Sequence, residues 1–141
     1  MIWQITLLVL LGCLERACGG ACSSGTRVGN KNPQGNRQHL DSTNGLSVLH
    51  QTTTYQVSCT CGEIYEWNYY AGATGTVHFQ VWRDIGSTFE LVGENVVTIT
   101  TSNDGSSSAS ITSGRIYVAE NDYIGLYVYL CYLIYVCFSL Y

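Results

Sequence analysis

The chain has 141 residues, of which 11% are charged, and its 10 acidic and 6 basic side chains give a formal net charge of -4. This length allows one domain with a single modest core. Because the charge balance offers nothing that attracts a polyphosphate backbone, we expect no nucleic-acid partner. Abundant Val, Ile, Thr and Tyr, with 15 glycines spread along the chain, are typical of a β-sheet protein.

The chain opens on an almost entirely apolar run from Ile2 to Leu11. This length matches the apolar core of a signal peptide and is short for a bilayer span. Small residues allow cleavage anywhere in 12–21, so we assign residues 1–21 to a signal peptide and leader and expect a secreted or cell-surface protein. Two alternatives stay open: a bacterial lipoprotein signal that lipidates Cys13, and a buried first element of a cytosolic protein.

Residues 22–46 are rich in Gly, Asn, Ser and Gln and predict an irregular lead-in. The pair Asn44-Gly45 predicts a turn into a short run at Leu46–His50. From Thr53 to Cys59 apolar and polar residues alternate, which predicts a half-buried strand.

Two further alternating runs flank the glycine-rich turn at 72–75. In the first, after Gly62, one face carries Tyr65, Trp67 and Tyr69. In the second, Thr76 to Trp82, one face carries Val77, Phe79 and Val81 and the other carries His78, Gln80 and Trp82. Both runs predict strands with one apolar face.

Shorter runs with turn signals between them follow at Phe89–Val92, Asn95–Thr101, Ser108–Thr112 and Arg115–Ala119. Strands at this spacing, without a long helical period, predict an all-β, antiparallel β-sandwich that is jelly-roll-like. We expect it to be a single domain covering residues 47–125.

The segment from Tyr123 to Tyr141 contains no charged residue, and it has several interpretations. It is long enough for a transmembrane helix, although its many tyrosines are unusual at mid-span. With the small pair Ser113-Gly114 and a polar spacer before it, it also fits a glycolipid-anchor signal. Tyr123–Tyr129 alternates like a last strand, and an altered C-terminus is a further alternative. We therefore assign 126–141 to an apolar tail, either a membrane anchor or an altered C-terminus.

Seven cysteines in an exported chain indicate disulfide bonds. The disulfide candidates are Cys18, Cys22, Cys59 and Cys61. Side chains two apart on a strand point the same way, so we expect Cys59 and Cys61 each to reach back to Cys18 or Cys22 and not to bond each other. The cysteine spacings are poor for zinc.

No catalytic, metal or cofactor constellation stands out, so we expect neither an enzyme nor a cofactor. His39, Asp41 and Ser42 have the residue types of a hydrolase triad but are near neighbours on a loop. Glu63 and Glu66 are not expected to share a strand face, which gives no support to a glycosidase. The oxygen-rich segment 41–45 leaves a calcium site as an alternative, although it lacks the full loop pattern.

Aromatic side chains are the remaining candidates for ligand contacts. Exposed rings on a sandwich stack against sugars, with polar neighbours donating and accepting hydrogen bonds. The candidate ligand-binding residues are Trp67, Tyr69, Gln80 and Trp82. Core packing is the alternative role for these rings.

The stretch from Tyr55 to Tyr127 resembles a β-sandwich module that recurs in extracellular proteins of marine invertebrates, including polycystin-like receptor ectodomains. The matching strings are Tyr55–Cys59, Gly62–Ile64, Gly75–Arg83 with its Phe-Gln-Val-Trp-Arg, Phe89–Gly93, and Asn121–Gly125 with its Asp-x-Ile-Gly. The chain departs from the module at Asp84, where the module has Pro, and at Leu126, where it has Trp. The resemblance implies an extracellular sandwich and no particular ligand.

These patterns together favour a non-enzymatic extracellular recognition or adhesion module whose ligand is an extracellular protein or a glycan. A carbohydrate-binding domain using Trp67 and Trp82 is the first alternative, and a secreted hydrolase is the second. The segment Tyr123–Tyr141 adds the prediction of a membrane tether.

Overall fold

The computed structural model describes residues 21–29, 47–49, 51–101, 106–129 and 133–140. The strands are, in chain order, β1 (Thr26–Gly29), β2 (Ser47–Leu49), β3 (Cys61–Ala71), β4 (Gly75–Asp84), β5 (Phe89–Ile99), β6 (Ser106–Ser110), β7 (Tyr117–Ala119), β8 (Tyr123–Tyr129) and β9 (Leu133–Leu140). One short 3-10 helix, η1 (Thr53–Tyr55), precedes β3. The predicted all-β class is confirmed.

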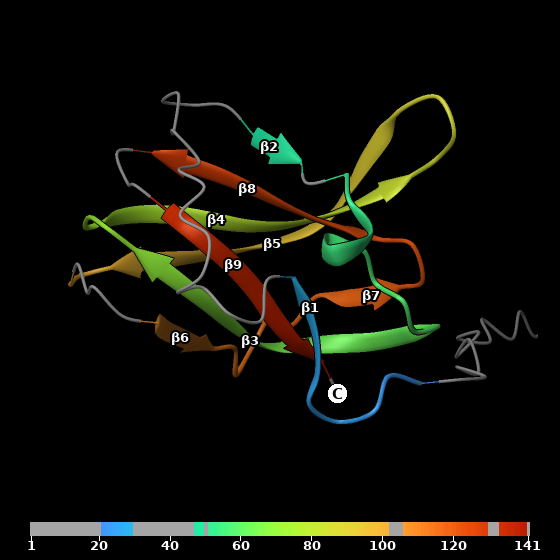
Figure 1. Ribbon diagram of the computed structural model, residues 1–141, viewed down its shortest axis with the longest axis horizontal. Helices are drawn as coiled ribbons and strands as arrows, with labels where there is room; N and C mark the ends of the chain where they lie inside the picture. The colour runs from blue at the N-terminus through green and yellow to red at the C-terminus, as the bar shows by residue number, and fades with distance from the viewer. Residues whose placement is uncertain (1–20, 30–46, 50, 102–105, 130–132, 141) are drawn as a thin grey trace, which may run out of the picture.

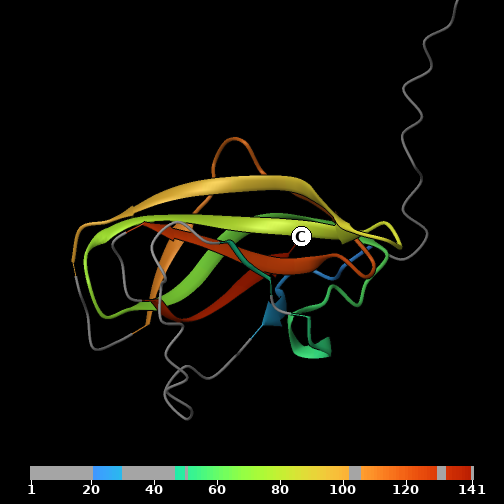
Figure 2. The same cartoon turned by 90° about the horizontal axis from the view of Figure 1, so that it is seen from above.

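The strands form two antiparallel sheets that pack face to face (Figures 1 and 2). One sheet has the order β1-β9-β3-β6, with β7 also pairing with β3, and the other has the order β2-β8-β4-β5. In Figure 2, β4 and β5 lie on one side of the molecule and β3 and β9 on the other. The late strands β8 and β9 insert beside the early strands β2 and β1, which is the connectivity of a jelly roll.

The core lies between the inner faces of the two sheets. Val77, Phe79 and Val81 of β4 have no exposed surface, which confirms the predicted apolar face of this strand. The Phe79 ring stacks on Trp67 of β3, with ring centroids 4.9 Å apart and planes 14° from parallel. Stacked aromatic pairs stabilise a fold beyond the burial of their apolar area. The contact between Trp67 and Phe79 therefore holds the centres of the two sheets together.

Strand β5 replaces two predicted strands, Phe89–Val92 and Asn95–Thr101. The intervening Gly93 continues the strand through a bulge, because Val81 of β4 pairs with Gly93 while Trp82 pairs with Leu91. A Cβ at position 93 would lie 3.2 Å from Cγ2 of Ile116, so glycine here permits a close approach of a buried side chain. The turn that the sequence predicts between the two runs is therefore wrong.

The predicted strand Thr53–Cys59 is wrong. Its first residues form η1, and Gln56 makes an isolated bridge to Tyr123. The Val57 N–H donates to the Asp122 carbonyl, and the Val57 carbonyl accepts from the Asn121 N–H. Alternation over seven residues was a local pattern here, and without a neighbouring chain that pairs along its length it does not make a strand.

The sheets extend beyond the predicted range of 47–125. β1 comes from the segment expected to be irregular, and β9 comes from the segment expected to be an apolar tail. β9 pairs with β1 on one side and with β3 on the other (Figure 1). Release of the chain at Ser113-Gly114 would remove β7, β8 and β9 from the two sheets.

The expectations for the N-terminal segment fall outside the described residues. These are the signal peptide and leader up to residue 20, the lipidated Cys13 and the Asn44-Gly45 turn. Within the described ranges, the structure contains no helix of sufficient length and hydrophobicity for a membrane span.

A disulfide bond joins Cys22 to Cys59, with their Cα atoms 5.2 Å apart, and Cys61 is also disulfide-bonded. The prediction that Cys59 bonds to Cys18 or Cys22 is therefore confirmed, with Cys22 as the partner. Cys18 lies outside the described residues. The bond is supported by a backbone hydrogen bond of 2.8 Å from the Cys22 N–H to the Cys61 carbonyl. The Cys22–Cys59 disulfide fixes the segment before β1 to the residues just before β3.

The Cys22–Cys59 bond closes a sequence separation of 37 residues. Replacing both cysteines with alanine is expected to lower the free energy of unfolding by about 3 to 4 kcal/mol, since the unfolded chain gains the freedom that the loop had removed. Urea unfolding followed by circular dichroism measures this change. A loss below about 1 kcal/mol would show that the cross-link is not a main support of the sheet edge.

Candidate recognition surface

The described residues do not gather into a catalytic or metal centre. In the ranges that the structure describes, no group of three or more His, Cys, Asp or Glu side chains is placed to hold a metal ion. Glu63 contacts Arg115 at 3.3 Å, and its pKa is lowered mainly by a hydrogen bond from Tyr117, whereas Glu66 accepts from the Asn68 amide at 3.1 Å. The two carboxylates thus have separate partners. The segment with His39, Asp41 and Ser42 lies outside the described residues.

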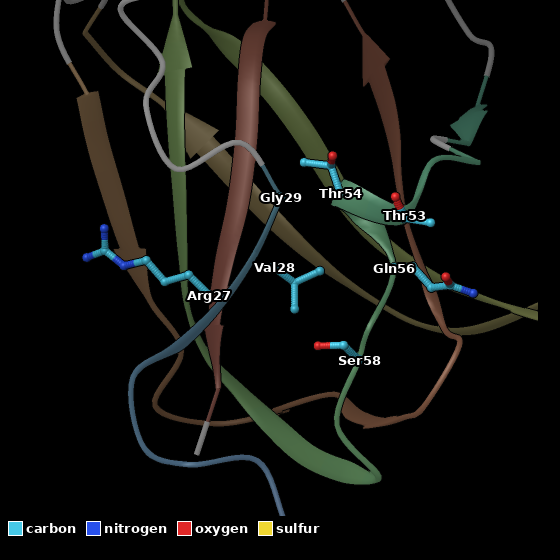
Figure 3. Close-up of a pocket in the computed structure, with 7 residues that line it drawn as sticks. All are labelled: Arg27, Val28, Gly29, Thr53, Thr54, Gln56 and Ser58. Atoms are coloured by element: carbon cyan, nitrogen blue, oxygen red, sulfur yellow. The ribbon is translucent and has the colours of Figure 1, made fainter.

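A pocket of about 360 Å³ lies between β1 and η1 (Figure 3). Its lining residues are Arg27, Val28, Gly29, Thr53, Thr54, Gln56 and Ser58. The Arg27 side chain points away from the other polar groups in Figure 3, and the Gln56 amide is already engaged with Asn121 and the Tyr123 hydroxyl. The described lining residues therefore do not bring a converging set of polar groups together in this pocket.

The outer face of the β2-β8-β4-β5 sheet offers a more organised surface. The register places its side chains in three rows across β8, β4 and β5, since directly paired residues share a face. The rows are Tyr123, Trp82 and Leu91, then Gly125, Gln80 and Glu94, then Tyr127, His78 and Val96. We call these nine residues the aromatic face. Its outer rows are aromatic and apolar, and its middle row is polar.

A chain of hydrogen bonds runs through the middle of the aromatic face. The Trp82 indole N–H donates to Oε1 of Gln80 at 3.2 Å, and Nε2 of Gln80 donates to Oε2 of Glu94 at 3.2 Å. His78 Nδ1 lies 3.2 Å from the same carboxylate oxygen. Because the indole can only donate, these contacts fix the orientation of the Gln80 amide and hold the Trp82 ring in place.

The hydrogen bond from Gln80 is the main cause of a lowered Glu94 pKa, and His78 contributes less. Replacing Gln80 with leucine is therefore expected to raise the Glu94 pKa toward its ordinary value of 4.5, and His78→Ala to raise it by less. Carboxyl NMR titration measures both shifts. An unchanged pKa in Gln80→Leu would contradict this hydrogen bond.

The sign of the pH dependence follows from the lowered pKa. The folded state favours the ionised carboxylate, so the contribution of this contact is present above the unfolded pKa and is lost as the pH falls through the folded pKa. The aromatic face therefore keeps a negative charge at neutral pH.

The aromatic rings of this face are held by their neighbours. His78 packs edge-on against Tyr127, with centroids 5.1 Å apart and planes at 84°. Tyr123 makes a similar contact with Phe89 at 5.9 Å, and its hydroxyl accepts a 3.0 Å hydrogen bond from Gln56. Rings that are already fixed lose little entropy when a ligand binds.

The structure separates the four residues that the sequence proposed for ligand binding. Trp67 has no exposed surface and donates its indole N–H to Asn95 Oδ1 at 2.9 Å, and Tyr69 is only 9% exposed. These two rings pack in the core, because the inner face of β3 has to fill the space opposite Phe79. Gln80 and Trp82 lie on the aromatic face, where Gln80 forms its floor at 5% exposure.

Several residues of the aromatic face were not predicted. Tyr127 falls in the predicted apolar tail 126–141, Tyr123 opens the uncharged segment with several interpretations, and Leu91, Glu94 and Val96 lie in one strand where the sequence predicts two. Glu94 and Val96 are two residues apart, so they share a face once the strand is known to continue through Gly93.

The outer face of the other sheet differs in composition. Its described side chains are mainly polar, and they include Arg27, Glu63, Glu66, Asn68, Ser106, Ser108, Ser110 and Ser139 together with Tyr70 and the exposed Tyr117. Asn68 bonds Glu66 and lies 3.4 Å from the Ser139 hydroxyl. We call this face the serine face. Its polar side chains do not form a hydrogen-bonded row framed by exposed aliphatic groups such as Leu91 and Val96 among the residues that the structure describes.

The two strings that carry the resemblance meet on the aromatic face. Trp82 pairs with Tyr123, Gln80 pairs with Gly125, and the Arg83 guanidinium binds Asp122. No protein-family model, no curated protein and no solved structure matches the chain. Function must therefore be argued from the surface itself.

Proposed function

We propose that the protein is a non-enzymatic extracellular recognition or adhesion module that binds its ligand through the aromatic face. The supporting observation is the fixed three-row arrangement, in which aromatic and apolar side chains frame a hydrogen-bonded polar row. Binding hot spots typically combine such rings with a few placed polar groups. The apolar leader and the Cys22–Cys59 disulfide support an exported location, secreted or at the cell surface.

The position of β8 and β9 bears on the membrane tether expected from Tyr123–Tyr141. A segment that is paired on both edges within a sheet does not at the same time span a bilayer as a helix. Our proposal accordingly relies on the folded sandwich and needs no tether.

A tetramer of the protein, applied to cell surfaces and to arrays of extracellular proteins and glycans, tests this function. We expect Trp82→Ala combined with Val96→Ser to weaken binding about tenfold or more. The matched variant on the serine face, Asn68→Ala with Ser108→Thr, should bind like the original chain. Binding that ignores the aromatic-face variant would reject this site, and substrate turnover abolished by one point mutation would reject a non-enzymatic role.

Carbohydrate binding is the second candidate, and the fixed Trp82 ring favours it. An indole held by its N–H bond to Gln80 presents a ring against which a sugar can stack. Jelly rolls include lectins, although the fold alone does not imply that function. Silence across the glycan array, or glycan binding unchanged in Trp82→Ala, would eliminate this candidate.

A further inference from the structure

Glu94 has an unused hydrogen-bonding atom in the middle of the aromatic face. Gln80 and His78 both contact Oε2, and Oε1 receives no hydrogen bond from the described part of the chain. The Glu94 side chain is 38% exposed. An ionised carboxylate oxygen with open access is a strong acceptor for a charged donor.

Two exposed aliphatic side chains lie beside this carboxylate on the same strand. Leu91 is 41% exposed and Val96 is 56% exposed, and both share the outer face with Glu94. Arginine and lysine carry aliphatic stems that cover apolar surface while their charged heads remain with polar partners. The spacing of Leu91, Glu94 and Val96 therefore suits a side chain with a long stem and a cationic head.

The charge of the aromatic face also favours a cationic ligand. Glu94 is the only Asp, Glu, Lys or Arg among its nine residues. No cation of this face competes for the carboxylate, apart from His78 when it is protonated. A cationic ligand would complete the charge balance, and nearby rings add cation–π attraction where a cation lies over them.

We propose that the aromatic face binds an arginine or lysine side chain displayed by a protein partner, with its head on Glu94 Oε1 and its stem over Leu91 and Val96. This inference rests on the proposed recognition function and names the ligand class of the same face. A neutral sugar would leave the negative charge of Glu94 uncompensated, and it has no long aliphatic stem to cover Leu91 and Val96. The observations thus favour a protein over a glycan.

Nitrogen-15 NMR titration tests the inference with blocked amino acids as defined ligands. The titrants are the N-acetyl methylamides of arginine, lysine and glutamine, together with a set of neutral methyl glycosides. The observed signals are the backbone amides of Glu94 and Val96 and the indole N–H of Trp82. We expect saturable shifts with arginine and lysine in the millimolar range, about tenfold weaker binding of glutamine, and loss of arginine binding in about 0.5 M salt.

Substitutions assign the binding to the named groups. Glu94→Gln keeps the size of the side chain and is expected to weaken arginine binding about tenfold. Glu66→Gln, which removes a carboxylate from the serine face, should leave binding unchanged. Val96→Ser provides a second variant that tests the stem contact without touching the polar row. Matching thermal unfolding curves show that each variant is folded.

The outcomes distinguish this inference from the function on which it rests. Equal binding of the glutamine and arginine compounds, arginine binding that is unaffected by Glu94→Gln, or no saturable shift would overturn the inference. Glycosides that shift the same signals independently of Glu94 would also overturn it while leaving the aromatic face as the recognition site. If no compound shifts these signals and the tetramer also ignores Trp82→Ala with Val96→Ser, both proposals fail.

Discussion

Replacing Asp122 with alanine is expected to lower the free energy of unfolding by about 4 kcal/mol, one of the two largest effects that we expect from changes to this chain. The Asp122 carboxylate has no exposed surface. Arg83 donates to it from Nε and Nη2, each at 2.8 Å, and the Ala119 N–H donates to Oδ2 at 2.8 Å. The substitution leaves these donors without their acceptor at the junction of β4 and β8.

Chemical denaturation measures this effect, with two comparisons. Glu120→Ala, an exposed neighbour, should change stability by less than about 0.5 kcal/mol. Asp122→Asn should remain strongly destabilising, because its amide nitrogen has to face donors where the carboxylate oxygen accepts. A loss below about 1 kcal/mol in Asp122→Ala would contradict the role of this ion pair.

Removing residues 130–141 is expected to abolish cooperative folding. Strand β9 pairs with β3 from Ile64 to Ala71 and with the whole of β1, so its loss breaks ladders on both sides. It also removes Leu140, which is fully buried. Since a domain is stable by only about 5 to 15 kcal/mol, this loss exceeds what the remaining sheet can absorb.

A proline at position 136 tests the same strand with a single change. Val136 pairs with Tyr69 inside the sheet, so Val136→Pro, which removes a backbone N–H, should cost about 3 kcal/mol or more. Val136→Ala keeps this N–H and is the control that separates the loss of the ladder from the loss of the side chain. Size-exclusion chromatography and thermal unfolding measure both variants and the truncation. A truncated chain that unfolds like the full chain would show that β9 is dispensable for the fold.

Much of the sandwich could be predicted because its central strands obey simple rules. β4 alternates regularly, β3 does so from Trp67 onward, and a glycine-rich turn separates them, so their existence and order follow from the residues. The predicted apolar face of β3 is right for Trp67 and Tyr69, but a register shift between Ile64 and Glu66 buries Ile64 in place of Tyr65. The failures have specific causes. Gly93 is a bulge residue that looks like a turn signal, and Thr53–Cys59 alternates without a partner along its length.

The two ends of the chain show a further limit of sequence patterns. β1 and β9 are short or ambiguous alone, and each becomes a strand through pairing with the other and, for β9, with β3. Long-range pairing of this kind is invisible to a local window. An uncharged segment such as Tyr123–Tyr141 fits a buried strand as well as a membrane segment, because both environments select the same residue types.

The candidate site was only partly predictable for a related reason. Trp67 and Trp82 both lie in alternating strands, and alternation shows which residues share a face without showing which face turns inward when both carry aromatics. The inner position of Trp67 depends on Phe79 across the sandwich and on its bond to Asn95. Glu94 could not be grouped with Gln80 until the register of β4 and β5 was known.

The placement of β9 between β1 and β3 also governs when folding can be completed during synthesis. The partner of Thr26 is Leu140, so the first sheet stays open along β3 until nearly the whole chain has been made. Contacts between residues this far apart in the sequence slow folding. A partly folded chain with an unpaired strand edge is prone to aggregate until the partner strand has formed. The emerging chain therefore depends on β9 to pair the open edge of β3, and chaperones that cover this edge should matter most before β9 has been synthesised.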